Sequence, residues 1–278
     1  RLRRSPSPIK MGEERRQRWG LCALQWRTKG VTVAALENVE VVYPGRGQAL
    51  GPIDLAIEAG EIVALVGPSG CGKSTALRLL AGLEQPTRGS VVRTAAKGET
   101  AVVFQAPTLA PWLTAEANVA LPLELAGADR GEARDRAAQA LARVGLAGAE
   151  KARPAALSGG MAMRVSLARA MVTEPRLLLL DEPFAALDEI TRRTLADDVL
   201  SLWESSRPAI VFVTHNVEEA AYMASRVAVL TRGPGRIAGV AKVDGPLPRP
   251  PSFRTQEVFR LAAEEVSSLL TLGMKASA

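Results

Sequence analysis

The feature that most constrains this chain is an apolar segment that runs directly into a glycine-rich loop. Residues 61–66, Glu-Ile-Val-Ala-Leu-Val, are almost continuously apolar, as is typical of a core strand covered on both faces. Residues 67–74 then fit the pattern G-x-x-x-x-G-K-S, and residues 72–83 have the composition of a helix. In this order the loop amides and the helix N-terminus point at a bound phosphate. The sequence therefore predicts a phosphate-binding strand–loop–helix unit.

Two side chains of this loop carry specific chemistry. Lys73 is expected to reach the β- and γ-phosphates of a nucleotide, and the Ser74 hydroxyl to hold Mg²⁺. The alternative is a glycine-rich turn with a surface lysine, but an accidental match in a chain of this length has odds on the order of one in a hundred. The residues expected to surround the phosphates are Gly67, Pro68, Ser69, Gly70, Cys71, Gly72, Lys73, Ser74 and Thr75.

The rest of the pattern alternates strands with helices, which predicts an α/β fold. Apolar runs predict further buried strands at 102–104, 177–180 and 209–213, with short strands around 226–243. Alternating patterns predict an antiparallel edge sheet from 31–33, 39–42 and 53–57. The expected helices after the first are 132–144, 161–171, 189–205, 217–224 and 255–270.

Charge is distributed unevenly along the chain. The formal net charge is +6, but residues 1–30 contribute +7, so the remainder is nearly neutral. We expect 1–30 to be a basic, disordered arm, 31–105 and 173–243 to form the core, 106–172 to form a helical subdomain, and 244–278 to be a C-terminal tail and helix. No uncharged run is long enough to cross a bilayer. Cys22 and Cys71 are too few for a disulfide scaffold.

Carboxylates at a strand end point to phosphoryl transfer. Such a reaction needs charge neutralisation and an aligned water more than covalent help. Glu182, at the end of the apolar strand 177–180, can polarise that water, while Asp181 beside it is better placed to serve a metal ion. Residues 158–160, Ser-Gly-Gly, open a helix and form a second anion-binding terminus. Because one chain has one terminus of each kind, a head-to-tail pair could enclose two nucleotides.

The ordered motifs resemble those of the ABC-transporter ATPase family over essentially all of residues 31–278. The resemblance implies a P-loop ATPase with a RecA-like core, an antiparallel β edge sheet and an inserted α-helical subdomain. It implies that Glu182 is the general base and His215 the switch histidine at the γ-phosphate. It further implies that Gln105 approaches Mg²⁺ and the attacking water, that Asp181 supports Mg²⁺, and that Lys73 binds the phosphates of ATP.

The same resemblance assigns nucleotide contacts farther from the loop. Tyr43 is similar to the aromatic residue that stacks on adenine. Ser158, Gly159 and Gly160 resemble the signature that contacts the ATP of a second ATPase subunit, and Asp188 matches the loop that crosses the dimer interface.

Each assignment has a plainer alternative. Tyr43 could simply cover the edge sheet, and Asp188 could be the N-cap of the helix that follows it. The pair of carboxylates at 181 and 182 could be an ordinary polar strand exit, and His215 could be a structural residue. As the chain's single histidine, directly after an apolar strand, it is better explained by the switch role.

Three segments, 105–114, 157–164 and 181–192, look like the nitrate/sulfonate/taurine importer branch of this family. That resemblance implies a peripheral ATPase at the cytoplasmic face of the membrane. Its partners would be a second ATPase subunit and a separate membrane permease, with a solute-binding protein outside. Trp112 would lie in the permease-docking region, its alternative being the core. A competing hypothesis is a soluble ABC ATPase that acts on nucleic acid through the basic arm, and a third is that the arm binds anionic lipid.

Overall fold

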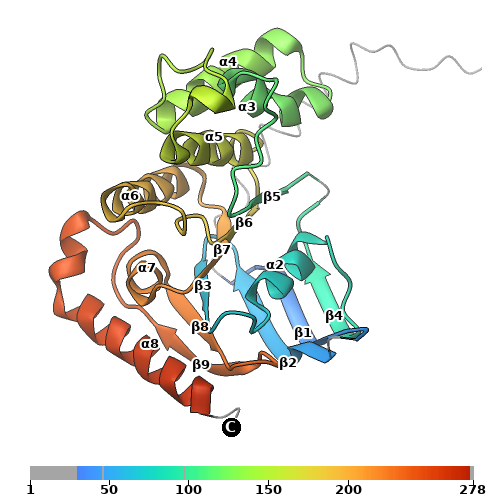
Figure 1. Cartoon of the computed structure of the whole chain (residues 1–278), viewed down its shortest axis with the longest axis vertical. Coiled ribbons are helices and arrows are strands. Elements are labelled where there is room, and N and C mark those ends of the chain that lie inside the picture. The colour runs from blue at the N-terminus through green and yellow to red at the C-terminus, as the bar shows by residue number, and fades with distance from the viewer. Residues whose placement is uncertain (1–29, 46, 97, 276–278) are drawn as a thin grey trace, which may run out of the picture.

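The computed structural model describes residues 30–45, 47–96 and 98–275 and arranges them around two β-sheets (Figure 1). The larger sheet has six strands, and all but its last strand run parallel. In spatial order these strands are β5 (Thr100–Val103), β6 (Leu177–Asp181), β7 (Ala209–Thr214), β3 (Ile62–Val66), β8 (Arg226–Leu230) and β9 (Ile237–Lys242).

The central strands are apolar because both of their faces are covered. Every residue of β3 and β7 is buried, and β6 is buried up to Asp181. The predicted strands at 61–66, 177–180 and 209–213 are thus confirmed. The prediction of a buried strand at 102–104 was wrong in one respect, because this strand is not fully buried. β5 is an edge strand in which only Val103 is buried, and Phe104 lies beyond its end with 37% of its surface exposed.

The smaller sheet is antiparallel, with the order β2–β1–β4. Its strands are β1 (Thr32–Tyr43), β2 (Gly47–Glu58) and β4 (Arg88–Arg93). The sequence predicted three short strands where β1 and β2 run for twelve residues each. Irregularities in the β1–β2 register interrupt the alternation of buried and exposed residues, and this hides the continuity of β1.

The α-helices of the described residues fall into two groups in Figure 1. Four pack around the larger sheet, and three stand at the other end of the molecule as a helical part. The first group comprises α2 (Lys73–Ala81), α6 (Glu189–Ser206), α7 (Val217–Met223) and α8 (Glu257–Lys275). The helical part comprises α3 (Ala115–Leu125), α4 (Arg130–Arg143) and α5 (Gly159–Met171).

The helical part has an apolar core of its own. Val119, Ala137, Leu141 and Val165 are completely buried together there. α5 also contacts β5 and α6, so it joins the helical part to the sheet. Two short 3-10 turns complete the described elements, η1 (Pro154–Ala156) and η2 (Pro251–Thr255). Where the chain divides into domains stays a prediction.

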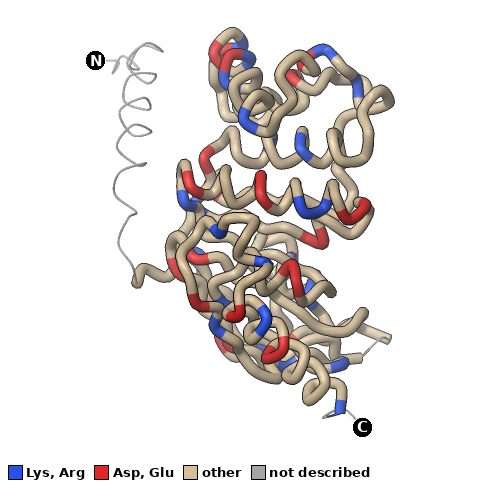
Figure 2. Tube along the Cα trace, turned by 90° about the vertical axis from the view of Figure 1, so that its left-hand side faces the viewer, with Lys and Arg blue, Asp and Glu red and all other residues tan. Residues whose placement is uncertain are grey.

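Charges of both signs are interleaved along the described part of the chain (Figure 2). This agrees with the near-zero net charge that the sequence assigns beyond residue 30. The predicted basic arm lies, apart from Gly30, outside the described residues. Among the described helices, none is both long and apolar enough to cross a membrane.

Candidate active site at the carboxyl edge of the sheet

The predicted site residues follow four neighbouring parallel strands. β5, β6, β7 and β3 lie side by side, and the carboxyl ends of parallel strands share one edge of a sheet. Gln105 follows β5, Asp181 and Glu182 end β6, His215 follows β7, and the loop that begins at Gly67 follows β3. The fold thus brings segments separated by up to about 150 residues of sequence to one edge.

The glycine-rich loop depends on glycines at both of its ends. Gly72 has φ +94°, and a Cβ atom there would lie 2.7 Å from the Ala49 carbonyl oxygen. A Cβ on Gly67 would lie 2.8 Å from Cys71 Sγ and 3.1 Å from the carbonyl oxygen of Leu230. A larger residue would push the loop away from the sheet at either position. Cys71 itself is fully buried, and this burial raises the pKa of its thiol, which argues against the reactive thiolate that a redox role would need.

The N-terminus of α2 differs from those of α3 to α7 in that no side chain caps it. Its N-cap is Gly72, and its first turn contains no acidic residue. Helices α3 to α7 each begin with a side chain that accepts a backbone N–H; these caps are Thr114, Asp129, Ser158, Asp188 and Asn216. The first N–H groups of α2 therefore remain available to an anion, whose charge the helix dipole favours.

Lys73 and Ser74 are held at this terminus by different contacts. Lys73 is 6% exposed, and its Nζ donates hydrogen bonds to the carbonyl oxygens of Gly67 at 2.8 Å and Pro68 at 3.0 Å. Ser74 Oγ donates to Asp181 Oδ1 at 2.9 Å. The latter bond joins the start of α2 to the end of β6, and it places a hydroxyl and a carboxylate next to each other.

Asp181 and Glu182 occupy unlike environments although they are adjacent. Burial raises the pKa of Asp181, while the hydrogen bond from Ser74 acts in the opposite direction. Glu182 has a φ of +45°, an uncommon conformation for a residue with a side chain. Its backbone N–H is tied to the Val213 carbonyl oxygen at 3.1 Å. Strained residues of this kind concentrate at functional sites, which favours a role for Glu182 beyond a polar strand exit.

His215 lies next to Glu182. Its Nδ1 is 3.4 Å from Glu182 Oε2, and its side chain is 66% exposed. A residue exposed to this extent contributes little to the core, so the alternative of a purely structural histidine loses support. Gln105 is also exposed, in the loop that follows β5. The structure thus brings Lys73, Ser74, Asp181, Glu182 and His215 into a connected set, and places Gln105 at the same edge.

Tyr43 is fixed through its hydroxyl group. The hydroxyl donates to Glu84 Oε1 at 2.5 Å and accepts from Arg78 Nη2 at 3.2 Å. Thr75 Oγ1 of α2 lies 3.3 Å from the same hydroxyl. Tyr43 is half-buried at the end of β1, so it both packs on the edge sheet and lies near the helix that starts at the phosphate loop.

The second predicted anion-binding terminus lies at the start of α5. The Ser158 side chain accepts the N–H of Met161 at 3.2 Å, and Ser158 and Gly159 are exposed. A Cβ on Gly160 would lie 2.8 Å from Thr191 Cγ2, so this terminus packs closely on the first turn of α6. Among the described residues, no hydrogen bond or ion pair joins residues 158–160 to the loop before α2.

Asp188 is the N-cap of α6, as its plainer alternative predicted. Its Oδ1 accepts the Thr191 N–H at 3.0 Å and its Oδ2 accepts the Thr191 hydroxyl at 2.6 Å. These two hydrogen bonds lower the pKa of Asp188. Capping does not exclude an interface role, because the Asp188 carboxylate is exposed.

One set of contacts at this edge was missed from the sequence. Glu219 of α7 accepts a hydrogen bond from Thr214 at the end of β7 and lies 3.5 Å from Arg192 of α6. The signal was local: Asn216 caps α7, which places Glu219 in its first turn, close to the strand end that precedes His215.

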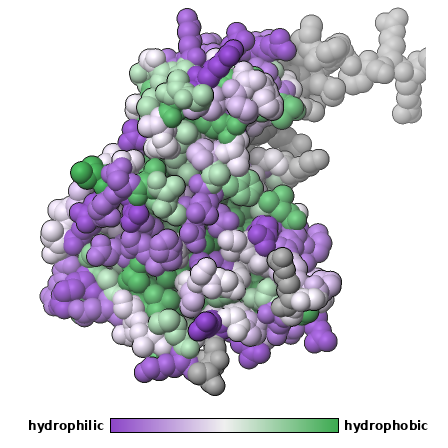
Figure 3. All heavy atoms as spheres, in the orientation of Figure 1, coloured by the Kyte–Doolittle hydropathy of each residue, from purple (hydrophilic) through white to green (hydrophobic). Residues whose placement is uncertain are grey.

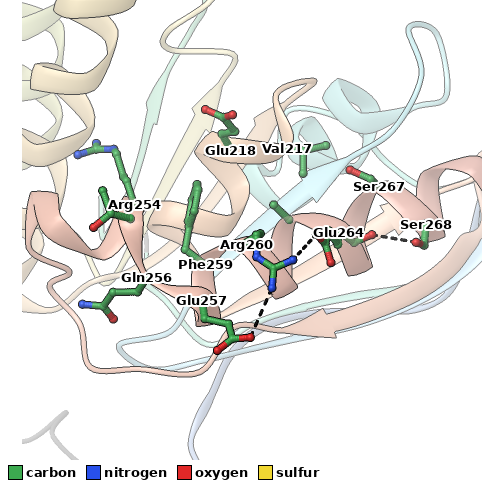
Figure 4. A pocket seen from close by; sticks show the side chains of 12 residues that line it. Val217, Glu218, Arg254, Gln256, Glu257, Phe259, Arg260, Glu264, Ser267 and Ser268 are labelled. Carbon is green, nitrogen blue, oxygen red and sulfur yellow. Dashed lines mark hydrogen bonds and ion pairs between the residues drawn. The ribbon is translucent and has the colours of Figure 1, made fainter.

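A groove also lies away from this edge. An open groove of about 1080 Å³ lies between α7 and α8 and is lined partly by Glu218, Phe259 and Arg260 (Figure 4). Arg260 pairs there with Glu257 at 3.4 Å and Glu264 at 2.8 Å. None of the predicted site residues lines it. Within residues 30–45, 47–96 and 98–275, no cluster of three or more His, Cys, Asp or Glu residues could hold a metal ion.

Comparisons with known proteins agree with this geometry. A family profile described as ABC transporter matches residues 50–185. An uncharacterized ABC transporter ATP-binding protein of Methanocaldococcus jannaschii is 44% identical over 222 residues, covering 77% of this chain and 83% of the relative. An aliphatic sulfonates import ATP-binding protein, SsuB 2 of Pseudomonas syringae pv. tomato, is 46% identical over 220 residues, covering 79% and 91% respectively.

Another relative is the bicarbonate transport ATP-binding protein CmpC of Synechococcus elongatus, which is 44% identical over 77% of this chain and 34% of the relative. Among solved structures, a dimeric ATP-binding cassette in a post-hydrolysis state bound to ADP and Pi superposes with a TM-score of 0.69. It is 32% identical and covers 76% of this chain and 99% of the solved chain. The predicted fold class and family resemblance are confirmed, and this chain belongs to the ABC transporter family as an ATPase cassette.

Proposed function

We propose that this chain is the ATPase subunit of an importer, which pairs with a second ATPase subunit of the same sequence at the cytoplasmic face of a membrane. The pair would drive a separate permease for a small anion such as nitrate, a sulfonate or taurine, delivered by a solute-binding protein outside. Relatives named for sulfonate import and bicarbonate transport support this class of solute. They favour it over the alternative of an ATPase that acts on nucleic acid.

The observation that carries the proposal is the bond between Ser74 and Asp181. It joins the phosphate-loop helix to the strand that presents Glu182. In the proposed site the loop amides, the N-terminus of α2 and Lys73 bind the ATP phosphates, while Glu182 polarises the attacking water and His215 contacts the γ-phosphate. Tyr43 would lie against the adenine.

The residues present fit a magnesium ion. Ser74 Oγ and Asp181 Oδ1 lie 2.9 Å apart and are the hard oxygen ligands that Mg²⁺ prefers, with Gln105 as a third at the same edge. Burial raises the pKa of Asp181, and a cation beside it would offset the cost of burying its charge. The ion would supply positive charge to the phosphate oxygens during transfer.

Exposed apolar side chains offer a surface for the permease. Trp112 is 73% exposed and Leu125, at the end of α3, is 80% exposed, so Trp112 does not belong to the core. Hydrophobic residues are visible on the helical part in Figure 3. Exposed apolar residues of this size are typical of protein interfaces, and the helical part lies at one end of the molecule in Figure 1.

Copurification and reconstitution test the proposal. The chain is expressed with the permease that copurifies with it, and ATP hydrolysis is measured in proteoliposomes with and without candidate anions. Stimulation by one anion, lost when Trp112 is replaced by Glu, is expected. A rate of ATP hydrolysis that does not change with any permease but rises when DNA or RNA is added would overturn the proposal in favour of the nucleic-acid alternative.

A further inference from the structure

A small cavity lies directly behind the predicted general base. It measures about 10 Å³, close to the space of one water molecule, and it is lined by Glu182, Phe184, Ala185, Arg192, Thr214, His215 and Glu219. Two of these residues, Arg192 and Glu219, are charged and have no part in the proposed chemistry. The groups that contact Arg192 and Glu219 indicate why two charged residues lie beside the proposed catalytic site.

Glu219 holds the end of β7, the strand that precedes His215. Its Oε2 accepts the Thr214 hydroxyl at 2.5 Å, and its side chain is 10% exposed. The same Thr214 hydroxyl accepts the backbone N–H of Asn216 at 3.0 Å. The residues on both sides of His215 are therefore fastened through one hydroxyl group, whose orientation the Glu219 carboxylate fixes.

Arg192 extends this connection to the loop that begins at Glu182. Its Nε lies 3.5 Å from Glu219 Oε1, and its Nη2 donates to the Leu187 carbonyl oxygen at 3.0 Å. Leu187 is tied back in turn, since its N–H donates to the Phe184 carbonyl oxygen at 3.1 Å. A continuous path thus runs around the cavity from the His215 segment to the Glu182 segment, alongside the direct 3.4 Å contact between those two side chains.

The energetics disfavour a purely stabilising role for this pair. Partial burial of this pair, whose side chains are 25% and 10% exposed, costs free energy that their attraction repays only when the geometry is good. Here Arg192 Nε is buried without a hydrogen bond, because its 3.5 Å approach to Glu219 does not have hydrogen-bond geometry. Replacing a buried ion pair with apolar residues of similar volume is often neutral or stabilising in proteins. A charged pair at this location is better explained by the groups that it orients.

We propose that Arg192 and Glu219 are positioning residues that set the placement of His215 relative to Glu182. This inference rests on the proposed function, in which Glu182 polarises the water that attacks the γ-phosphate. Neither residue is among those proposed to bind the nucleotide, so their loss should affect the rate of hydrolysis rather than the binding of ATP.

The test compares conservative variants with matched controls in the full chain. Glu219→Gln keeps the shape and the oxygen that accepts from Thr214 but removes the charge, while Arg192→Met removes the guanidinium and Arg192→Lys keeps its charge. The controls are Glu218→Gln, the exposed neighbour in α7, and Arg193→Met, which breaks the exposed pair with Glu189 one residue along α6. For each variant, kcat, KM for ATP with Mg²⁺, nucleotide affinity and Tm are measured.

Glu219→Gln and Arg192→Met are each expected to lower kcat at least tenfold, with KM and nucleotide affinity within about twofold of the parent. Arg192→Lys should recover part of the rate, and the double variant should lose no more than the worse single variant because the two residues act together. Both controls should resemble the parent.

Parent-like kcat in Arg192→Met overturns the inference, as does a loss of kcat accompanied by equal losses of affinity and Tm. If Glu219→Gln does not fold, the two Arg192 variants alone test the positioning role. Glu182→Gln is measured in parallel: parent-like hydrolysis there would refute the proposed role of Glu182 itself. An inactive Glu182→Gln beside a parent-like Glu219→Gln would refute only the positioning role.

Discussion

The N-termini of α2 and α5 both contain glycine, as the N-cap Gly72 in α2 and as the first two helical residues in α5, but they differ in what surrounds them. The α2 terminus has no capping side chain and adjoins Lys73, Ser74 and Asp181 of its own chain. The α5 terminus is capped by Ser158, which is exposed together with Gly159. The first therefore has the charged groups that a nucleotide phosphate requires, whereas the second offers mainly backbone donors and a hydroxyl.

This difference indicates how each chain could contribute one half of each of two nucleotide sites. Figure 1 places α2 beside the sheets and α5 in the helical part, and no described hydrogen bond or ion pair links the two termini. In a head-to-tail pair, each α5 terminus would close the phosphate site of the partner subunit. The α2 terminus should then govern binding of ATP, and the α5 terminus should govern association.

The largest effect is expected at the α2 terminus. Replacing Lys73 with Ala removes a buried cation from the phosphate site, so affinity for ATP should fall at least 100-fold, as measured by titration with a fluorescent nucleotide. The Tm without nucleotide serves as the control for folding. Retained affinity in a folded Lys73→Ala variant would contradict the phosphate-loop interpretation.

Glu182→Gln should separate the binding of ATP from its hydrolysis. The amide keeps the size of the side chain but cannot accept the proton of the attacking water, so kcat should fall by about 100-fold or more while affinity for ATP is kept. Because ATP then persists between the two termini, a dimer should accumulate in size-exclusion chromatography with ATP and Mg²⁺. Wild-type turnover in this variant would remove Glu182 from the role of base.

Ser158→Arg should block association of the two subunits, while ATP should still bind at the α2 terminus. The long cation would occupy the exposed α5 terminus, so the ATP-dependent dimer of the Glu182→Gln background should be lost while the monomer still binds ATP. Ser158→Ala is the matched control, since it removes the cap but leaves the surface open. An undiminished dimer in Ser158→Arg would refute the head-to-tail arrangement.

The sequence predicted the phosphate loop, α2 and the adjoining buried strands better than it predicted the elements around them. The strand–loop–helix unit, β6 and β7 are recognisable because apolar runs and motifs are local signals. β4 was missed because five of its six residues are exposed and show no alternation. Pairing of Arg192 with Glu219 spans 27 residues and two helices, and only the packing of α6 against α7 brings them together.

The smallest effect concerns the helix caps, and pH distinguishes two of them. Ser158→Ala should destabilise the protein by about 1 kcal/mol at every pH, because a hydroxyl cap does not titrate. Asp188→Ala removes a carboxylate cap whose pKa is lowered by its hydrogen bonds with Thr191. A lowered pKa in the folded state gives stability that is present above the unfolded-state pKa, near 4, and is lost as pH falls through the folded-state value. The loss of Tm in Asp188→Ala should therefore be largest near neutral pH and shrink on acidification, while that of Ser158→Ala stays constant. Equal pH dependence of the two variants in thermal melts would show that the Asp188 carboxylate does not stabilise α6 through its charge.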